Sequence, residues 1–459
     1  MTKKKKLSLL LIIEILIGLS SSVFLISKHI PSEYSYIFLL PLFFSMCILV
    51  TFKNYVIKLN KLGTGMYILN VVMLIRYIIS PVSMASLNSY YGGFGPNLGK
   101  KYIDFAIIMM IFEMLSVFIV IVLKYNNRNT NKEMDFEFLD EKFILIIVCI
   151  LGIIYLFPYF DEIIPKNLFI LPEDYNKNIQ IGGSILVIKQ TVAVSLFLIS
   201  LKFLYLIYLR NRIIIIPYIS AALILIFMGI NMGSSRWNVI IPCLVGLYAI
   251  KILYPNQFKK IIFIVLGVLT ISILSISMYK FSWAIKKPTD IIEVFAMQLQ
   301  DYFSGPKQVA QGIAMSYEYS DRITIKTFFN DFLGSIPIVS NFINQDNRIN
   351  NYFNLFNMIG NKSLIIPMVS NGFVYFGAIF APMLSVICTI ISMDLSYKIK
   401  STKFLEVRLV YLMIVFWTSM FMGFNAQIVF GNIVIVVISN LVIILMNSNV
   451  YRLKKFKNM

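Results

Sequence analysis

Histidine is almost missing from this sequence: His29 is the single one in 459 residues. A zinc site of the HExxH kind and a Ser-His-Asp hydrolase triad both need histidines at particular places, so neither has support here. The chain also has no Walker A or GxGxxG phosphate loop, so we expect no cofactor, whether metal, ATP or a dinucleotide. His29 stands at the end of the first apolar run, where an interfacial residue is the simplest interpretation.

Cysteines and acidic residues are also few. The four cysteines all fall inside apolar runs without a CxxC spacing, which predicts buried thiols rather than disulfides or metal ligands. The chain has 22 acidic and 41 basic residues, which give it a net charge of +19. Because the basic residues flank apolar runs and no nucleic-acid module is recognisable, we interpret the charge as membrane orientation and expect no nucleic-acid partner.

Apolar residues dominate what is present. The chain is 58% hydrophobic and 14% charged, with a mean hydropathy of +0.80, which is typical of a membrane protein. A helix needs about 20 apolar residues to cross a bilayer, and the runs do not alternate as barrel strands do. We therefore predict an all-α polytopic bundle, one continuous domain over 1–459, with about twelve spans. These are 7–27, 36–52, 63–84, 102–123, 143–159, 183–204, 213–230, 237–254, 261–280, 365–393, 409–424 and 428–446.

The connections between the runs predict the orientation. Most of the 41 lysines and arginines fall on one set of alternate connections, which places both termini in the cytoplasm. The stretch "MTKKKKLSLLLIIEILIGLSSSVFLIS" has too long an apolar run for a signal peptide and no cleavage site, so it reads as an uncleaved first span. The same count of lysines and arginines on alternate connections places Arg236 and the long connection over 281–364 on the outer side.

That long connection is expected to be functional, because long ordered loops usually are. "TDIIEVFAMQLQDYFSG" begins with a helix-capping signal and continues with apolar residues on one helical stripe. "TIKTFFNDFLGSIPIVSNFI" mixes aromatic and polar residues in a similar way. We expect these helices to lie along the outer membrane surface with their apolar sides down, as a folded lid.

Outward arginines are few and isolated. Arg236 stands between two apolar runs in "GSSRW", where small neighbours allow a ligand close to the backbone, although a snorkelling helix-end residue is an equal alternative. Arg322 and Arg348 lie in the long connection as either ligands or ordinary solvated charges. Arg76 falls inside the third span, so it must be paired or line a polar cavity.

Outer carboxylates and tyrosines complete the candidates. Asp161–Glu162 would suit a metal-dependent sugar transferase, but a solvated loop is the plainer interpretation. Tyrosines of the long connection are suited to stacking on sugar rings; these are Tyr302, Tyr317, Tyr319 and Tyr352. Arginines facing outward and a lid suit a reaction whose energy already resides in a phosphoanhydride-linked lipid, since guanidinium groups stabilise a departing diphosphate.

The chain resembles the bacterial Wzy-type polymerases of O-antigen and capsular repeat units. The resemblance covers most of the chain as topology, with both ends inside and one large outer loop before the last spans. Locally it rests on "MGSSRWNVIIP", "DYFSGPKQVAQG" and "KSLIIPMVSNGFVYFGAIFAPMLSVI". It implies an enzyme of the bacterial cytoplasmic membrane that joins polyprenyl-diphosphate-linked oligosaccharides without a metal. Further implied partners are the lipid bilayer, a chain-length regulator and a flippase.

The resemblance also implies the site residues. Catalytic roles go to Arg236, Arg322 and Arg348. The resemblance leaves the general base unassigned, and Asp301 and Asp321 are the candidates for it. Substrate-binding roles go to Arg76, Tyr302, Ser304, Gly305, Lys307, Asn371 and Tyr375. The chain departs from the R-x10-G spacing of some relatives, and it lacks the loop histidine of the related ligases, which favours a polymerase.

Three other functions stay open. A lipid-linked oligosaccharide flippase of the same pathway is the main alternative, although flippases usually keep short loops and deeper charges. A membrane O-acetyltransferase lacks a suitably placed histidine. A metal-dependent lipid-linked glycosyltransferase would need Asp161–Glu162 to bind a divalent cation.

Overall fold

The computed structural model describes residues 3–91, 94–124, 135–139, 143–160, 183–231, 236–281, 290–337, 339–343, 347–358 and 364–447. Within these ranges the chain is built of helices, and its one β-type pairing is an isolated bridge between Glu137 and Phe404. Contacts divide the chain into two compact units. Unit 1 comprises Met1–Asn131, Lys287–Tyr397 and Val415–Asn432, and unit 2 comprises Lys132–Lys286, Lys398–Ile414 and Ile433–Met459.

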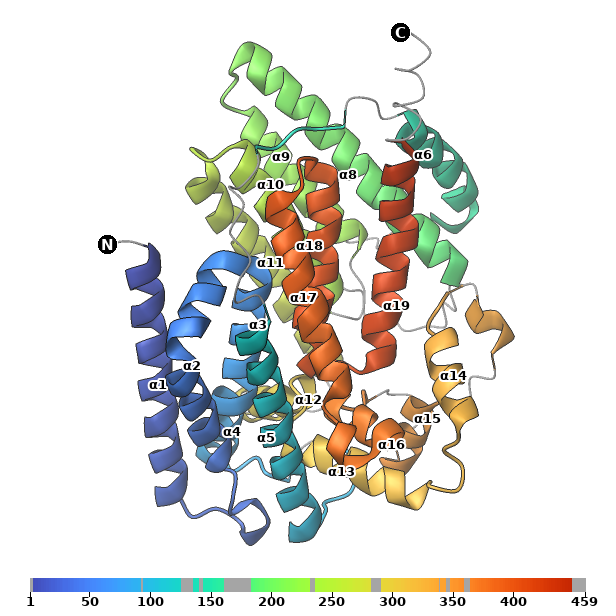
Figure 1. Cartoon of the computed structure of the whole chain (residues 1–459). Coiled ribbons are helices and arrows are strands. Elements are labelled where there is room, and N and C mark those ends of the chain that lie inside the picture. The colour runs from blue at the N-terminus through green and yellow to red at the C-terminus, as the bar shows by residue number, and fades with distance from the viewer. Residues whose placement is uncertain are drawn as a thin grey trace. The chain divides into compact units, whose positions relative to one another are not determined.

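Unit 1 begins with a group of long apolar helices and contains the described part of the long connection (Figure 1). Its first elements are α1 (Lys3–Ser27), η1 (Ser32–Tyr34), α2 (Leu39–Leu62), α3 (Thr64–Leu74), a π-helical turn η2 (Ile75–Ile79), α4 (Ser80–Ser86) and α5 (Lys100–Leu123). Later elements are α12 (Asp290–Tyr302), α13 (Pro306–Glu318), α14 (Ile325–Leu333), η4 (Val339–Phe342), α15 (Ile349–Phe356), α16 (Met368–Phe380) and η5 (Phe421–Gly423).

Unit 2 contains the helices of the middle of the chain. They are α6 (Phe143–Leu156), η3 (Phe157–Tyr159), α8 (Gly183–Asn211), α9 (Ile216–Ile230), α10 (Trp237–Leu253) and α11 (Phe258–Phe281), together with a π-helical turn η6 (Val437–Val442). By the bounds given above, α17 (Met383–Ser401), α18 (Leu405–Ser419) and α19 (Ala426–Val436) contribute residues to both units. All four cysteines are free and buried, which confirms the expected thiols.

The chain is a multi-pass α-helical membrane protein by the length and composition of its helices. Seven described helices are long and apolar enough to cross a bilayer, and the bent pair α16 and α17 would make an eighth. The apolar helices of residues 143–159, 216–230 and 237–253 are each shorter than that test requires. Each predicted run therefore contains helix over most of its described residues. The count of twelve spans stays a prediction, as does the single domain over 1–459.

The bend between α16 and α17 is the sharpest break in an apolar pair. The two helices meet at 106°, and Gly377 near the end of α16 has a φ of 72°, a conformation that side chains disfavour. Within α16, a Cβ added at Gly372 would lie 2.1 Å from the Ala381 carbonyl oxygen. The chain can fold back on itself here because Gly372 has no side chain.

This close approach makes Gly372 sensitive to a single methyl group. We expect Gly372→Ala to destabilise the protein by about 1–3 kcal/mol, the usual cost of overpacking a tight contact. Gly267→Ala is the matched control, because a Cβ there meets nothing within 4 Å and the helix α11 should gain from alanine. Thermal unfolding in detergent measures both, and equal midpoints for the two variants would contradict the close packing.

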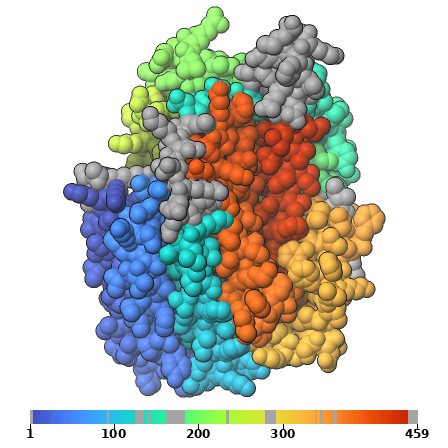
Figure 2. Space-filling view, viewed as in Figure 1, coloured from blue at the N-terminus to red at the C-terminus, as the bar shows by residue number. Residues whose placement is uncertain are grey.

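The long connection folds as helices with an unusual polarity. The predicted helix at 290 is present as α12, and Thr324 caps α14 through a reciprocal pair of hydrogen bonds with Thr327. Along α14, Ile325, Phe329 and Leu333 are exposed while Thr327, Asn330 and Asp331 are buried. Such an exposed apolar stripe suits a lipid-facing helix. In the space-filling view the yellow surface of this segment adjoins the orange surface of α16 (Figure 2).

Helix α13 behaves differently, because protein encloses most of it. Every residue from Pro306 to Met315 is buried, and the helix packs against α5, α15 and α16. The expectation that the loop's helices rest on a membrane surface therefore does not extend to α13. The lid itself stays a prediction for α12 and α14.

Candidate functional site

Two groups of polar residues form around the long connection in unit 1, and the first is the turn from α12 into α13. Ser304 has a positive φ of 53°, and the Gly305 amide donates to the Gln300 carbonyl oxygen at 2.8 Å. A Cβ on Gly305 would lie 2.3 Å from Cγ of Gln300, so only glycine allows the turn to close this tightly. Pro306 then starts α13, where its fixed φ suits the first helical position.

Asp301 is the acidic residue of this turn, which we name the Asp301 corner (residues 300–308). The Gln308 side chain donates from Nε2 to Oδ1 of Asp301 at 3.1 Å. Burial raises the pKa of Asp301 to about 7, while the positive charge of Lys307 and the Gln308 hydrogen bond oppose that shift. Burial also lowers the pKa of Lys307. A carboxyl group that titrates near neutral pH is suited to general acid–base chemistry.

Amide and ammonium groups tie the Asp301 corner to the connection before α5. The Gln311 side chain donates to the carbonyl oxygens of Phe94 at 2.9 Å and Pro96 at 3.2 Å. Lys307 reaches the carbonyl oxygen of Tyr91 at 3.4 Å and is only 4% exposed. These contacts join the corner to the connection before α5 through one ammonium and one amide group.

The second group, the Asp331 cluster, comprises Asp331, Arg348, Tyr375 and Gln427. Asp331 is fully buried and accepts from the Ile349 amide at 3.2 Å and from the Tyr375 hydroxyl. Its Oδ1 also forms an ion pair with Nε of Arg348 at 3.6 Å. Gln427 donates to the Tyr375 hydroxyl at 2.7 Å. Burial raises the pKa of Asp331, while the Tyr375 hydrogen bond and the Arg348 charge oppose the shift. Asp331 thus joins α14, α15 and α16 at one point.

Aromatic rings surround the Asp331 cluster. The ring of Tyr375 meets Phe328 edge-on at 4.9 Å between centroids, and Phe332 lies 5.5 Å from Phe430. Phe328, Phe332, Tyr375 and Phe430 are all partly exposed. Partly exposed rings beside polar groups are the usual means of binding a sugar, because the ring stacks on apolar C–H faces while polar groups bind hydroxyls.

The start of α19 lies between the two groups. A Cβ on Gly423 would lie 2.6 Å from the Tyr302 carbonyl oxygen, so η5 contacts the Asp301 corner directly. The Asn371 side chain accepts from the Ala426 amide at 3.1 Å, and the next residue, Gln427, belongs to the Asp331 cluster. The polar residues predicted from the two loop motifs are therefore linked through η5 and the first turn of α19.

The three predicted catalytic arginines occupy different surroundings. Arg322 is exposed, with its guanidinium 5.7 Å from the centroid of the Tyr319 ring. Arg348 forms an ion pair with the buried carboxylate of Asp331. Arg236 is partly buried directly before α10 in unit 2, whereas the other two belong to unit 1. Residues 232–235 of the predicted motif lie outside the described residues.

Arg76 meets the expectation that an intramembrane arginine must be paired. Its Nη1 lies 2.9 Å from Oε2 of Glu113, and both side chains are fully buried. Ser385 donates to the other oxygen of Glu113. Arg76 lies in the π-helical turn η2, which the sequence did not predict. Arg76 is enclosed by protein and paired with Glu113. Its direct substrate-binding role stays a prediction.

The structure brings some predicted site residues together and separates others. Asp301, Tyr302, Ser304, Gly305 and Lys307 form the Asp301 corner, and Arg348, Asn371 and Tyr375 meet at or beside the Asp331 cluster. The predictions missed Asp331, Gln427 and Glu113. Asp331 shares the polar face of α14 with Thr327, four residues earlier, while Ile325, Phe329 and Leu333 form the other face. This amphipathic pattern was the available signal.

Among the described residues no group of three or more His, Cys, Asp or Glu is arranged to hold a metal ion, and Asp161–Glu162 lies outside those residues. The arrangement defines a multi-pass helical membrane protein with two linked polar groups beside its long connection. No protein-family model, curated protein or solved structure matches the chain.

Proposed function

We propose that the chain polymerises polyprenyl-diphosphate-linked oligosaccharide repeat units on the outer face of a bacterial cytoplasmic membrane, as the Wzy-type polymerases do. The proposal includes about twelve spans, cytoplasmic termini and no cofactor. The observation that carries it is Asp301, a carboxyl group with a pKa of about 7 held by Gln308 beside Lys307. Such a group is a general base suited to deprotonating a sugar hydroxyl near neutral pH.

The proposed step is a single transfer with its atoms balanced. A hydroxyl oxygen of the incoming unit bonds to the anomeric carbon of the growing chain, and the bond from that carbon to the diphosphate oxygen breaks. The hydroxyl proton passes to Asp301, and the polyprenyl diphosphate leaves with the bonding electron pair. Lys307 supplies a positive charge beside Asp301 to stabilise the leaving group.

Other residues would hold the sugar chain. Arg322 lies at the far end of α13 from Asp301, about 20 Å away for a helix of 13 residues. Arg322 is therefore assigned to a remote part of the substrate rather than to the reacting diphosphate. The partly exposed rings around the Asp331 cluster are placed to stack on sugars, and Arg348 positions Asp331 rather than contacting the substrate.

Reconstitution tests the proposal directly. The purified protein is incubated in detergent with a polyprenyl-diphosphate oligosaccharide, and the products are separated by size. A ladder spaced by one repeat unit is the expected result. Unchanged donor, with a substrate shown to be polymerised by cells that carry this protein, would refute the polymerase.

Arg236 is tested in the same assay. If it binds the diphosphate, as its motif implies, Arg236→Ala should lower the rate by about 10²-fold, the cost of losing one charged donor to a departing anion. Arg210→Ala is the control, because Arg210 is an exposed arginine in the last turn of α8. Equal ladders from both variants, at equal protein levels, would show that Arg236 does not bind the diphosphate and is a snorkelling residue at a helix end.

A flippase is the second candidate, and the buried Arg76–Glu113 pair favours it. Flippases usually carry charges deep inside the bundle, and this pair is fully buried among membrane-spanning helices. Liposomes separate the two functions: labelled lipid-linked oligosaccharide that crosses the bilayer without forming a ladder would establish the flippase.

A further inference from the structure

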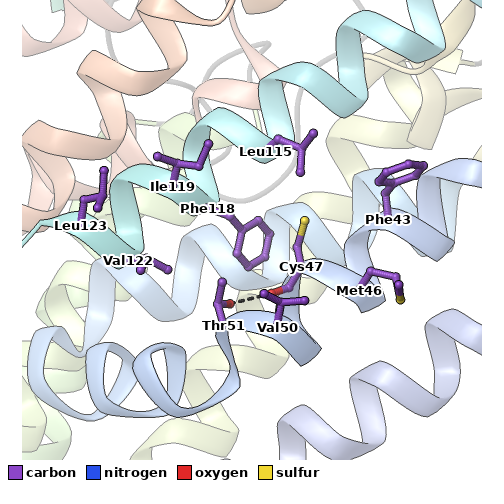
Figure 3. Close-up of a pocket in the computed structure, with 10 residues that line it drawn as sticks. All are labelled: Phe43, Met46, Cys47, Val50, Thr51, Leu115, Phe118, Ile119, Val122 and Leu123. Atoms are coloured by element: carbon purple, nitrogen blue, oxygen red, sulfur yellow. Dashed lines mark hydrogen bonds between the residues drawn. The ribbon is translucent and has the colours of Figure 1, made fainter.

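An apolar groove runs along the outside of unit 1 between α2 and α5 (Figure 3). Its volume is about 400 Å³. Cys47 and Phe118 form its buried floor, and Met46, Val50, Ile119 and Leu123 are exposed along it. In the close-up the Phe118 ring of α5 lies toward Cys47 and Thr51 of α2, and the hydroxyl of Thr51 is turned back to the Cys47 carbonyl oxygen.

The two helices that form the groove run in the same direction and end their apolar stretches together. Thr51 of α2 and Leu123 of α5 both line the groove, and the next charged residues are Lys53 and Lys124. The Lys58 ammonium group donates to the Lys124 carbonyl oxygen, which joins the two helices at this end. The groove therefore leads from an apolar interior to a boundary where both helices become basic.

Lysines gather at that boundary. Lys53, Lys58 and Lys61 lie on α2 and Lys124 directly follows α5, and Lys124 forms an ion pair with Asp394 at 2.6 Å. Lys53 is exposed, one helical turn beyond the rim residue Val50. The carbonyl groups at the end of α5 would disfavour an anion, but Lys58 already binds the last of them.

We propose that this groove is a specific site for one anionic phospholipid. An acyl chain occupies the groove between α2 and α5, and the phosphate lies at its basic end beside Lys53 and Lys124. An apolar channel that ends in lysines is complementary to a single molecule with a hydrocarbon chain and a negative headgroup, because lysine binds phosphate as a point charge. A zwitterionic lipid offers the same chain without the net charge. The site is independent of the proposed polymerase activity.

Native mass spectrometry of the full chain in detergent tests the site. Phosphatidylglycerol and phosphatidylcholine with identical acyl chains are titrated separately onto delipidated protein. We expect one copy of phosphatidylglycerol to bind about tenfold more tightly than phosphatidylcholine, and Val50→Trp, which fills the groove, to remove that preference. Leu49→Trp is the matched control, because Leu49 is an exposed residue of the same helix that does not line the groove.

The headgroup is tested separately by Lys53→Glu, which should lower phosphatidylglycerol binding toward that of phosphatidylcholine while leaving the latter unchanged. Lys6→Glu, an exposed lysine of α1, is the control. The proposal is overturned if both lipids bind wild-type protein equally. It is also overturned if Val50→Trp keeps the same preference for phosphatidylglycerol as Leu49→Trp. It is also overturned if polyprenyl phosphate displaces phosphatidylglycerol at equal concentration, since the groove then belongs to an isoprenoid lipid.

Discussion

Asp301→Asn should lower the rate of repeat-unit polymerisation by about 10²–10⁴-fold, the usual contribution of a positioned general base. The amide keeps a hydrogen-bond acceptor for Gln308, so the turn between α12 and α13 should still form. What the variant loses is the group that removes the proton from the attacking hydroxyl. Ladder formation at saturating donor measures the effect, with protein level and unfolding midpoint as controls for folding.

Asp321→Asn is the matched variant, because Asp321 is the other candidate base and is exposed. We expect it to polymerise at the wild-type rate. The reverse result, loss in Asp321→Asn and retention in Asp301→Asn, would transfer the role of base to Asp321. Retention in both variants would remove the Asp301 carboxyl group from the mechanism.

The pH dependence gives a second readout for Asp301. Because the pKa of Asp301 is raised to about 7, the wild-type rate should increase with pH and level off above about 7, while Asp301→Asn should stay low and flat. Stability should change in the opposite direction. A carboxyl group with a raised pKa in the folded state favours folding most at acidic pH, and that contribution is lost as the pH rises through about 7. Asp301→Asn should therefore be relatively more stable than wild type at pH 8 than at pH 5.

Glu113→Ala should destabilise the protein by about 3–5 kcal/mol, the largest stability effect we expect from a single substitution. The variant leaves the Arg76 guanidinium fully buried in the bundle without its carboxylate, and it leaves Ser385 without its acceptor. Removing one partner of a buried ion pair costs more than removing both, because the remaining charge stays desolvated.

The double variant Arg76→Met/Glu113→Met tests this reasoning. Replacing both partners by apolar side chains should restore most of the lost stability. Glu293→Ala, at an exposed carboxylate of α12, should leave the unfolding midpoint unchanged. Thermal unfolding in detergent compares the variants. A double variant as unstable as Glu113→Ala would show that the pair is not the source of the loss.

Several features of the candidate site could be predicted from local sequence. Ser304, Gly305 and Pro306 are the residue types that end one helix and begin another, and the structure places a tight turn there. The need to pair Arg76 also followed from sequence, because a lone charge in an apolar span is costly. The identity of its partner did not, because Glu113 reaches Arg76 from α5, and Glu113 itself accepts a hydrogen bond from Ser385 of α17.

The sequence by itself determined that the chain is helical and membrane-spanning, because a backbone in lipid must satisfy its hydrogen bonds within its own helix and long apolar runs need no partner to do so. Only the tertiary structure decided which charged groups are exposed and which are paired inside the protein. Arg322 and Arg348 are alike in sequence, yet one is exposed and the other pairs with buried Asp331. The same holds for Asp301 and Asp321, of which Asp321 is exposed. Burial at a helix turn, which depends on packing against distant segments, raises the pKa of Asp301 toward neutrality.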